Sequence, residues 1–485
     1  MNSAYKKKLS GSALVFALII MTAVAIVLTS VLAFITSQTK YSLRVQAREQ
    51  AFQIAESGIH FYRWYLAHQV EGRTAQQVQD FWTSGSPYGV GTAYEAEYVD
   101  PAGSAVGKYR ITVTPPELGS TVVTVRSTGW TYRYPDDMRT LEVRFRRPSW
   151  SESAVLANDF MRFGAGTETF GKIHSNQGIR FDGVAHNVVS SSVATYDDPD
   201  HTGNNEFGVH THDPMDPLPP AAVPVRTDIF EAGRTFPVAT VDFNGVLGDL
   251  NYMKSEAQAG ANGNRYFAND SNDVGRRIVL KADGTFGVCK VAAANFTTTN
   301  GITSYRRNSG SSTCGTCSGL CLSTYTIPDN GIIFVEDNVW IDGQISNKKV
   351  TIAAADLVSG SNPSVYIGND ITYSNYDGHD IIGIIGQRNI EIIRDSDTNL
   401  RIDAALLAQQ GRIGRANYGS SDSKNSITIY GALATNQRYG FAWTNGTANW
   451  GYATRNLYYD NNLLYYPPPY FPTGTQYQMD LWEEK

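Results

Sequence analysis

The feature that most constrains this chain is an uncharged, apolar run at residues 12–35, close to the N-terminus. A helix needs about 20 apolar residues to cross a bilayer, whereas the apolar core of a secretory signal has only about 7–15. The run is therefore long enough to stay in a membrane. The lysine triplet at residues 6–8 favours a cytoplasmic N-terminus and an exported remainder, although Lys40, Arg44 and Arg48 flank the other end and weaken that argument.

The same helix is predicted to continue beyond the membrane to about residue 70. Proline is absent from residues 1–86, so nothing in this stretch obliges the helix to stop. Apolar side chains recur at intervals of three, four or seven residues, at Tyr41, Val45, Phe52, Ala55, Ile59, Tyr62 and Leu66. A stripe of this kind is typical of a helix that packs one face against a partner.

The leader and the exported part of this helix resemble a known family. The segment KKKLSG at residues 6–11 resembles the class III leader of type IV prepilins, and AFQIAESGIHFYRWYL at residues 51–66 is similar to PilX-type minor pilins. The resemblance implies that a prepilin peptidase cleaves between Gly11 and Ser12 and that Ser12 is methylated. It also implies that the N-terminal helix contacts other pilin-like subunits. Major pilins carry Glu at the fifth mature position, where this chain has Phe16, which argues against ordinary polymerisation.

Residues 71–148 are predicted to form a small antiparallel sheet that covers the exported half of the helix. Loose alternation in its third strand predicts a bulge near Gly129. The helix at 12–70 and this sheet together form an α+β module, followed by a linker at 149–158. The predicted strands are 94–99, 108–114, 121–132 and 138–145, separated by turns rich in Pro, Gly and Asp.

Residues 159–466 indicate an all-β body, in which short β-branched runs alternate with Gly, Asn and Asp. Segments that begin at Ile382, Ala404 and Gly431 repeat one another, which favours a parallel β-helix; a pair of β-sandwiches is the rival. Phrases such as RIDAALLAQ and YGALATNQRYGF resemble the large β-helical extensions of some PilX-type proteins. The aromatic and proline-rich residues 467–485 are expected to cap the open end, the alternative being a sugar-binding surface.

Four cysteines lie close together, at Cys289, Cys314, Cys317 and Cys321. Four thiolates could bind zinc, but cysteines of an exported domain usually oxidise. Two disulfides are therefore expected, and all three pairings remain open.

A second polar segment contains His210, His212 and Asp213, shortly after three aspartates and His201 at residues 197–201. Such residues could hold a transition metal or calcium, but no known calcium-loop spacing is present. The sequence favours a solvated loop without a metal.

The sequence offers little support for an enzyme. Asp342, Asp370, Asp380 and Asp403 lie on or near predicted strands, but no motif joins them, and no hydrolase, zinc-protease or phosphate-loop motif occurs. The net charge of -6 gives no case for a nucleic-acid partner. No cofactor is expected.

The expected function is that of a minor pilin-like structural subunit, anchored by one membrane helix, with its body at the cell surface or on a pilus. The β-helical body would serve assembly or adhesion to surface glycans or cells. The alternatives are a surface-anchored, polysaccharide-active β-helix enzyme and a glycan-binding module without a pilus.

Overall fold

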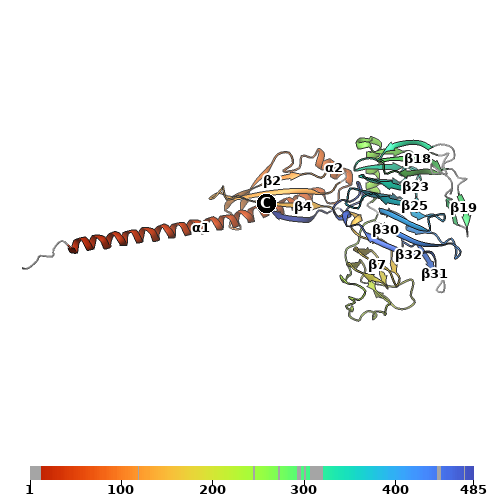
Figure 1. Cartoon of the computed structure of the whole chain (residues 1–485), viewed down its shortest axis with the longest axis horizontal. Helices are drawn as coiled ribbons and strands as arrows, with labels where there is room; N and C mark the ends of the chain where they lie inside the picture. The colour runs from red at the N-terminus through yellow and green to blue at the C-terminus, as the bar shows by residue number, and fades with distance from the viewer. Residues whose placement is uncertain are drawn as a thin grey trace, which may run out of the picture.

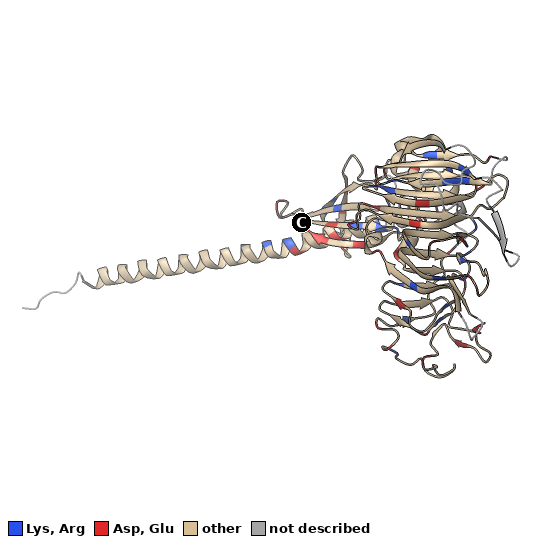
Figure 2. Ribbon diagram, turned by 45° about the vertical axis from the view of Figure 1, so that its right-hand side comes forward, with Lys and Arg blue, Asp and Glu red and all other residues tan. Residues whose placement is uncertain are grey.

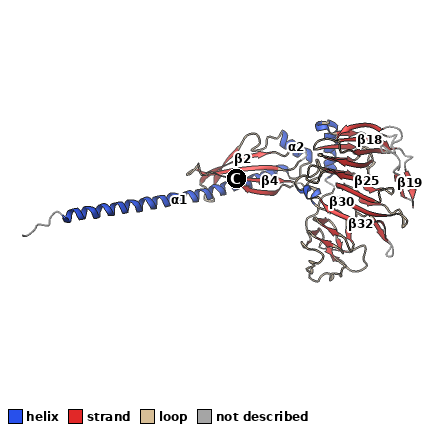
Figure 3. Cartoon of the chain, in the orientation of Figure 1, coloured by secondary structure: helices blue, strands red, loops and turns tan. Residues whose placement is uncertain are grey.

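The computed structural model describes residues 12–117, 120–243, 246–270, 274–291, 296–299, 302–305, 321–444, 449–474 and 476–485. They form a long N-terminal helix, a small antiparallel sheet on its C-terminal half, and a large strand-rich body beyond that sheet (Figure 1). Figure 3 shows that most of the helical structure lies in the first of these parts. The predicted order, α+β followed by a strand-rich body, is confirmed.

Helix α1 (Ser12–Val70) lies in two different environments. Its apolar first half projects away from the rest of the chain with its large side chains exposed (Figure 1). Among the described residues it is the one helix long and apolar enough to cross a membrane. The second half buries Ala47, Ala51, Ile54, Ala55, Ile59, Tyr62, Leu66 and Val70. The predicted stripe therefore begins later than expected, because Tyr41 and Val45 are exposed.

A five-stranded antiparallel sheet packs against this second half of α1. Its strands, in spatial order, are β1 (Tyr94–Val99), β2 (Ala105–Thr114), β3 (Val123–Thr131), β4 (Arg139–Arg146) and β33 (Gln478–Glu484). The first four match the predicted strands to within three residues. A short helix that was not predicted, α2 (Ala75–Thr83), begins with a capping box at Thr74 and adds buried Phe81 and Trp82 to the same core.

The predicted bulge at Gly129 is wrong, because the register of β3 against β2 and β4 continues through this residue. Gly129 instead lets the sheet approach α1 closely. A Cβ atom there would lie 2.4 Å from the carbonyl oxygen of Ala51 and 2.4 Å from the amide nitrogen of Ala55. The glycine is therefore required by packing against the helix.

The body is built on a long ladder of parallel strand pairs. In spatial order the ladder joins β16 (Arg265–Phe267), β22 (Gly331–Val335), β24 (Lys349–Ala354), β26 (Ile381–Gly386), β28 (Asn399–Ala408), β30 (Ser423–Thr435), β5 (Val155–Ala157), β8 (Ile173–Ser175), β11 (Val189–Ser191) and β15 (Arg234–Thr235). The sequence repeat is reproduced in the register, since Ile384, Leu406 and Leu433 occupy successive strands. A closed parallel β-helix stays a prediction.

The order of this ladder divides the body into two arms. The N arm, residues 155–235, starts in the middle of the ladder at β5 and runs to one end. Helix α3 (Val246–Ala259) follows, and the C arm, residues 265–459, then begins at the other end and returns until β30 meets β5. Figure 1 shows the N arm around β7, below the strands of the C arm.

Further strands complete the two arms. A second parallel ladder joins, in spatial order, β17 (Gly275–Leu280), β23 (Val339–Ile345), β25 (Val365–Tyr373), β27 (Ile390–Ile392) and β29 (Ile413–Arg415). A third joins β30, β32 (Asn449–Tyr459), β7 (Glu168–Thr169) and β10 (Val184–Ala185). A fourth joins β6 (Met161–Phe163), β9 (Ile179–Phe181) and β14 (Val209–His210). Antiparallel pairs join β12 (Thr195–Tyr196) to β13 (Glu206–Phe207), β18 (Thr285–Val291) to β17 and β21 (Cys321–Thr326), β19 (Phe296–Thr299) to β20 (Ile302–Tyr305), and β31 (Ala442–Thr444) to β32.

The central strands of the C arm are buried on both faces. Ile384 and Leu406 belong to the main core, whereas the alternate residues Ile385 and Leu407 belong to a second core together with Leu250 of α3. Strands buried on both sides have continuous apolar runs instead of alternating ones. This explains why the repeats contain so few polar positions.

Two boundaries differ from the prediction. Residues 149–158 are not a linker, because β5 lies within the main ladder. The C-terminal tail covers the side of the central strands, where a Cβ atom on Gly383 would lie 2.7 Å from Pro468 and 3.1 Å from Phe471. Its last segment, β33, returns to the small sheet and pairs with β4. The tail therefore ties the body to the helix module.

Candidate metal centre

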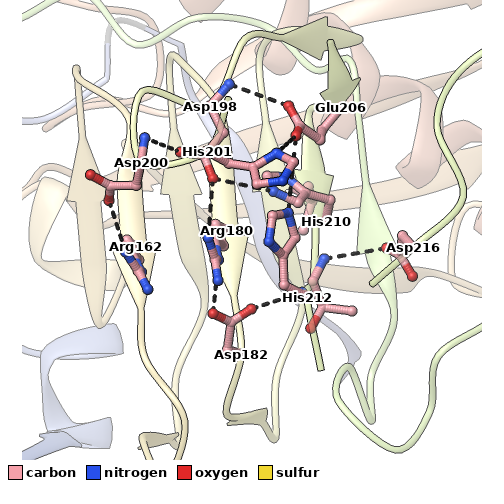
Figure 4. Close-up of polar contacts among 12 residues, drawn as sticks. Arg162, Arg180, Asp182, Asp198, Asp200, His201, Glu206, His210, His212 and Asp216 are labelled. Atoms are coloured by element: carbon pink, nitrogen blue, oxygen red, sulfur yellow. Dashed lines mark hydrogen bonds and ion pairs between the residues drawn. The ribbon is translucent and has the colours of Figure 1, made fainter. Parts of the chain in front are cut away.

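A cluster of histidine and carboxylate side chains lies in the N arm, at the hairpin of β12 and β13 (Figure 4). The turn of this hairpin carries Asp198 and His201, and β13 begins with Glu206. His210 ends β14, and His212 lies two residues further along the chain, after Thr211. The hairpin and the strand after it thus bring all five side chains together.

The local backbone explains why these side chains share one side. His210 and His212 lie on either side of Thr211, beyond a bend at Gly208, and side chains two positions apart point the same way in an extended chain. Gly208 between the two strands allows a close approach, because a Cβ atom there would lie 1.9 Å from the carbonyl oxygen of Val193. Alternation therefore aligns His210 with His212, whereas Glu206 reaches the cluster from β13, on the other side of the bend.

The distances are short enough for a shared ligand. The potential ligand atoms of Asp198, His210 and His212 all lie within 4.8 Å of one another, and so do those of His201, Glu206 and His212. Nε2 of His210 lies 3.7 Å from Oδ2 of Asp198. Nε2 of His212 lies 4.0 Å from Oε1 of Glu206, and Nδ1 of His201 lies 2.9 Å from the same oxygen. His212 belongs to both groups.

The cluster is largely shielded from solvent. The side chains of Asp198 and His210 are 1% exposed, that of Glu206 is 3% and that of His212 is 11%, whereas His201 at 33% forms the outer rim. Within the described residues, neither ring nitrogen of His210 has a hydrogen-bond partner, and the same holds for Nε2 of His212 and Oδ2 of Asp198. Buried polar atoms without partners are costly.

Arg180 and Asp182 support the cluster from β9 and the residue that follows it (Figure 4). Nη1 of Arg180 lies 3.6 Å from Oδ2 of Asp198, and its Nε donates to Oδ2 of Asp182 at 2.8 Å. The backbone amide of His212 donates to Oδ1 of Asp182 at 2.8 Å. Asp182 thus balances the charge of Arg180 and fixes the backbone at His212.

The surroundings determine the charge of the ligating groups. Burial alone would raise the pKa of the Asp198 carboxyl, but His210, the Asp200 amide and Arg180 outweigh it and lower that pKa to about 2. Burial, reinforced by Arg180, lowers the pKa of His212. An ionised carboxylate and a neutral imidazole are the forms that bind metal ions.

The expectation of a solvated loop at residues 197–213 is wrong for the ligating side chains, because most of them are buried. The sequence interpretation also missed Glu206 and Arg180. The spacing of His210 and His212 was the available signal for part of the cluster, since a period of two places both side chains on one face of an extended segment.

Other residues singled out from the sequence are distributed elsewhere. Ser12 is the first residue of α1, whereas Gly11, Cys314 and Cys317 lie outside the described residues. Cys289 on β18 and Cys321 on β21 are direct backbone partners in an antiparallel pair. The structure thus brings the first and last of the four cysteines together.

The four aspartates considered for catalysis accept hydrogen bonds from neighbouring strands and loops. The donors are Arg277 and Asn369 for Asp342, the Arg401 amide for Asp370, the Lys348 and Asn375 amides for Asp380, and the Tyr373 amide and Tyr376 hydroxyl for Asp403. These contacts indicate a structural role for each carboxylate. That the chain is not an enzyme stays a prediction.

Comparison with known proteins gives a loose structural likeness. No family model matches the chain, and no curated protein matches it. Among solved structures, the competence-associated pilin ComZ from Thermus thermophilus aligns with 91% of this chain and 98% of its own, at 13% identity and a TM-score of 0.31. A likeness of this size assigns neither a family nor a function to this chain.

Proposed function

We infer that this chain is a membrane-anchored, pilin-like structural subunit of a type IV pilus-like assembly. The observation that carries the proposal is helix α1, whose apolar first half is exposed and whose second half is buried under an antiparallel sheet. A bilayer, or a bundle of similar helices, is the environment that such an exposed apolar helix requires. The buried half connects this anchor rigidly to the folded part.

The basic residues along α1 indicate where the bilayer would end. Lys40 and Arg44 follow the apolar run, and Arg48 lies 3.4 Å from Asp137 near the small sheet (Figure 2). Basic side chains at the end of a membrane helix commonly contact lipid headgroups. The bilayer would therefore end before the small sheet, with the whole body on one side of it.

A minor subunit fits better than a major one. The body lies beyond the small sheet, at the far end of α1 from the apolar run (Figure 1), and its width would obstruct close packing of neighbours along a shaft. Phe16 stands where major pilins carry Glu. The resemblance of residues 6–11 and 51–66 to PilX-type minor pilins supports the same role, with a prepilin peptidase as processing partner. We therefore place the subunit at or near a tip.

Processing of the leader tests this proposal. The mature protein from sheared pili should begin with methylated Ser12, as read by N-terminal mass spectrometry. Gly11→Leu should leave the leader attached and remove the protein from the sheared fraction, whereas Ser10→Ala serves as the control in the same leader. A mature protein that keeps Met1 and stays with the membranes would contradict the proposal.

The parallel ladders support a β-solenoid body for assembly or adhesion. Tyr376, Tyr465 and Tyr466 are exposed, and Nζ of Lys349 lies 3.9 Å from the ring centre of Tyr466. Exposed aromatic rings beside cations and amides suit contacts with sugars or proteins. A glycan array with the wild-type protein and with Tyr465→Ala/Tyr466→Ala tests this: selective loss of signal supports adhesion, and an array without signal favours assembly.

We also propose that Cys289 pairs with Cys321. Directly opposed residues of antiparallel strands have Cα atoms about 4.5–5.5 Å apart, within the span of a disulfide. The register places these two cysteines opposite each other, next to an irregularity between Val288 and Cys289. Cys314 and Cys317 would form the second pair. Non-reducing peptide mapping should recover both pairs, and a Cys289–Cys314 peptide would refute this assignment.

A further inference from the structure

We propose that Asp198, Glu206, His210 and His212 bind one divalent transition-metal ion of the zinc class, which holds the β12–β13 hairpin against β14. The four side chains come from a hairpin turn, the start of β13, the end of β14 and the segment just beyond β14. A single ion would therefore link three local segments of the N arm.

The unpartnered atoms carry the proposal. Oδ2 of Asp198, Nε2 of His210 and Nε2 of His212 lack hydrogen-bond partners among the described residues, and these three residues form one of the two tight groups. Folded proteins rarely leave several buried polar atoms unsatisfied at the same place. A cation bound by all three would satisfy them together.

The geometry requires only small movements. Ligands of a tetrahedral zinc ion lie about 2.0–2.2 Å from the metal, so neighbouring ligand atoms are roughly 3.3–3.5 Å apart. The observed separations of 3.7 Å between His210 and Asp198 and 4.0 Å between His212 and Glu206 exceed this by less than 1 Å. Asp198, His210 and His212 need only shifts of this size, whereas Glu206, which shares a tight group with His212 and His201, must also rotate toward Asp198 and His210.

The donor set selects the class of metal. Two imidazoles and two carboxylates suit zinc and its neighbours in the first transition row, whereas calcium and magnesium prefer oxygen ligands alone. Two carboxylates also neutralise a divalent ion, and Asp182 already balances Arg180. The set therefore holds the ion without a net buried charge.

Supporting contacts orient the ligands as metal sites commonly require. His201 lies 2.9 Å from Oε1 of Glu206, and the Asp198 amide donates to Oε2 of Glu206 at 3.3 Å. Oδ1 of Asp198 accepts from the Asp200 amide at 2.9 Å, which leaves Oδ2 for the metal. The low exposure of the set is typical of a structural site.

The test uses the detergent-solubilised full chain, stripped with a chelator and then dialysed against zinc, cobalt or calcium. We expect one bound zinc per chain by elemental analysis and a higher unfolding temperature with zinc but not with calcium. His212→Gln should weaken zinc binding by about 100-fold or more. His186→Gln is the matched control, because His186 lies in the same arm, 2.8 Å from Glu231, outside the cluster.

Two readouts keep the proposal testable if His212→Gln fails to fold. Cobalt-loaded wild-type protein should show the visible bands of a tetrahedral nitrogen and oxygen site, without the thiolate charge-transfer absorption that binding at the cysteines would give. Zinc should also slow hydrogen exchange at residues 195–212. Thiolate absorption, protection confined to another region, equal stabilisation by calcium, or unchanged zinc affinity in His212→Gln would each overturn the proposal.

Discussion

The two arms of the body are stabilised in different ways, although they share one ladder. Central strands of the C arm are longer and mainly aliphatic, such as β26 (Ile381–Gly386), with cores on both faces. Strands of the N arm span only two or three residues, and its interior includes Asp198, Glu206 and His210. Long apolar strands dominate the C arm, whereas the N arm also holds a buried polar cluster with unpartnered atoms, which we propose binds a metal ion.

The largest effect is expected from a charge in the C arm. Leu406 is fully buried and lies between Ile384 and Leu433 in the ladder. Leu406→Asp should reduce the free energy of unfolding by about 4 kcal/mol or more, because a buried unpaired charge is poorly solvated. Urea unfolding followed by circular dichroism measures this loss.

The control for that change is Ile384→Val, which should cost only about 1 kcal/mol. Since β30 also pairs with β5, unfolding of the C arm should remove the N arm too. An N arm that stays protected from proteolysis in Leu406→Asp would show that the two arms are independent.

Metal removal is the next largest effect, and it should act on the N arm and not on the C arm. Chelation should destabilise the N arm by about 3–4 kcal/mol at metal concentrations 100–1,000 times the dissociation constant, and should leave the C arm unchanged. Hydrogen exchange of residues 155–235 and 265–459 with and without zinc measures both arms in one experiment. Equal changes in both arms would show that the ion does not stabilise the N arm selectively.

Helix α3, between the arms in the chain, carries a group with a marked pH response. Burial raises the pKa of Asp249 to about 6, against the opposing charge of Arg147. The folded state holds the Asp249 proton more tightly than the unfolded state does, so this proton contributes to the free energy of unfolding. The contribution is complete below the ordinary aspartate pKa and is lost as pH rises through about 6. The loss is at most about 3 kcal/mol.

Asp249→Asn removes this titration. From pH 4 to pH 7.5 the free energy of unfolding of Asp249→Asn should therefore rise relative to that of the wild type, by at most the loss given above. Urea unfolding of both proteins at each pH measures this difference. Only the difference between the two proteins is interpreted, since other groups titrate in both. A constant difference across this range would contradict the assigned pKa.

The smallest effect concerns a salt bridge across the junction of the arms. Oδ2 of Asp200 in the N arm lies 2.7 Å from Nη2 of Arg438 in the C arm and 3.5 Å from Nη1 of Arg162. Arg438→Gln should cost about 0–1 kcal/mol, because partly exposed ion pairs contribute little. A double-mutant cycle with Asp200→Asn isolates the pair, and a coupling well above this range would show that the junction depends on it.

Several elements could be predicted because they depend on local pattern. The helix at 12–70, four strands of the small sheet and the repeat that aligns Ile384 with Leu406 all follow from periodicity and from the absence of proline. The candidate site was predicted only in part. His210, His212 and the aspartates were noticed, but their burial was not, because burial depends on what packs around a turn.

The amino-acid sequence was sufficient to predict the apolar first half of α1, the order of helix, sheet and strand-rich body, and the repeat within the C arm. Each of these depends on the spacing of side chains along a few turns or strands. Only the tertiary structure decided that β5 joins β30, that β33 returns to β4 and that Glu206 meets His212. Such contacts join segments whose positions depend on how the arms fold back, and no local periodicity encodes that path.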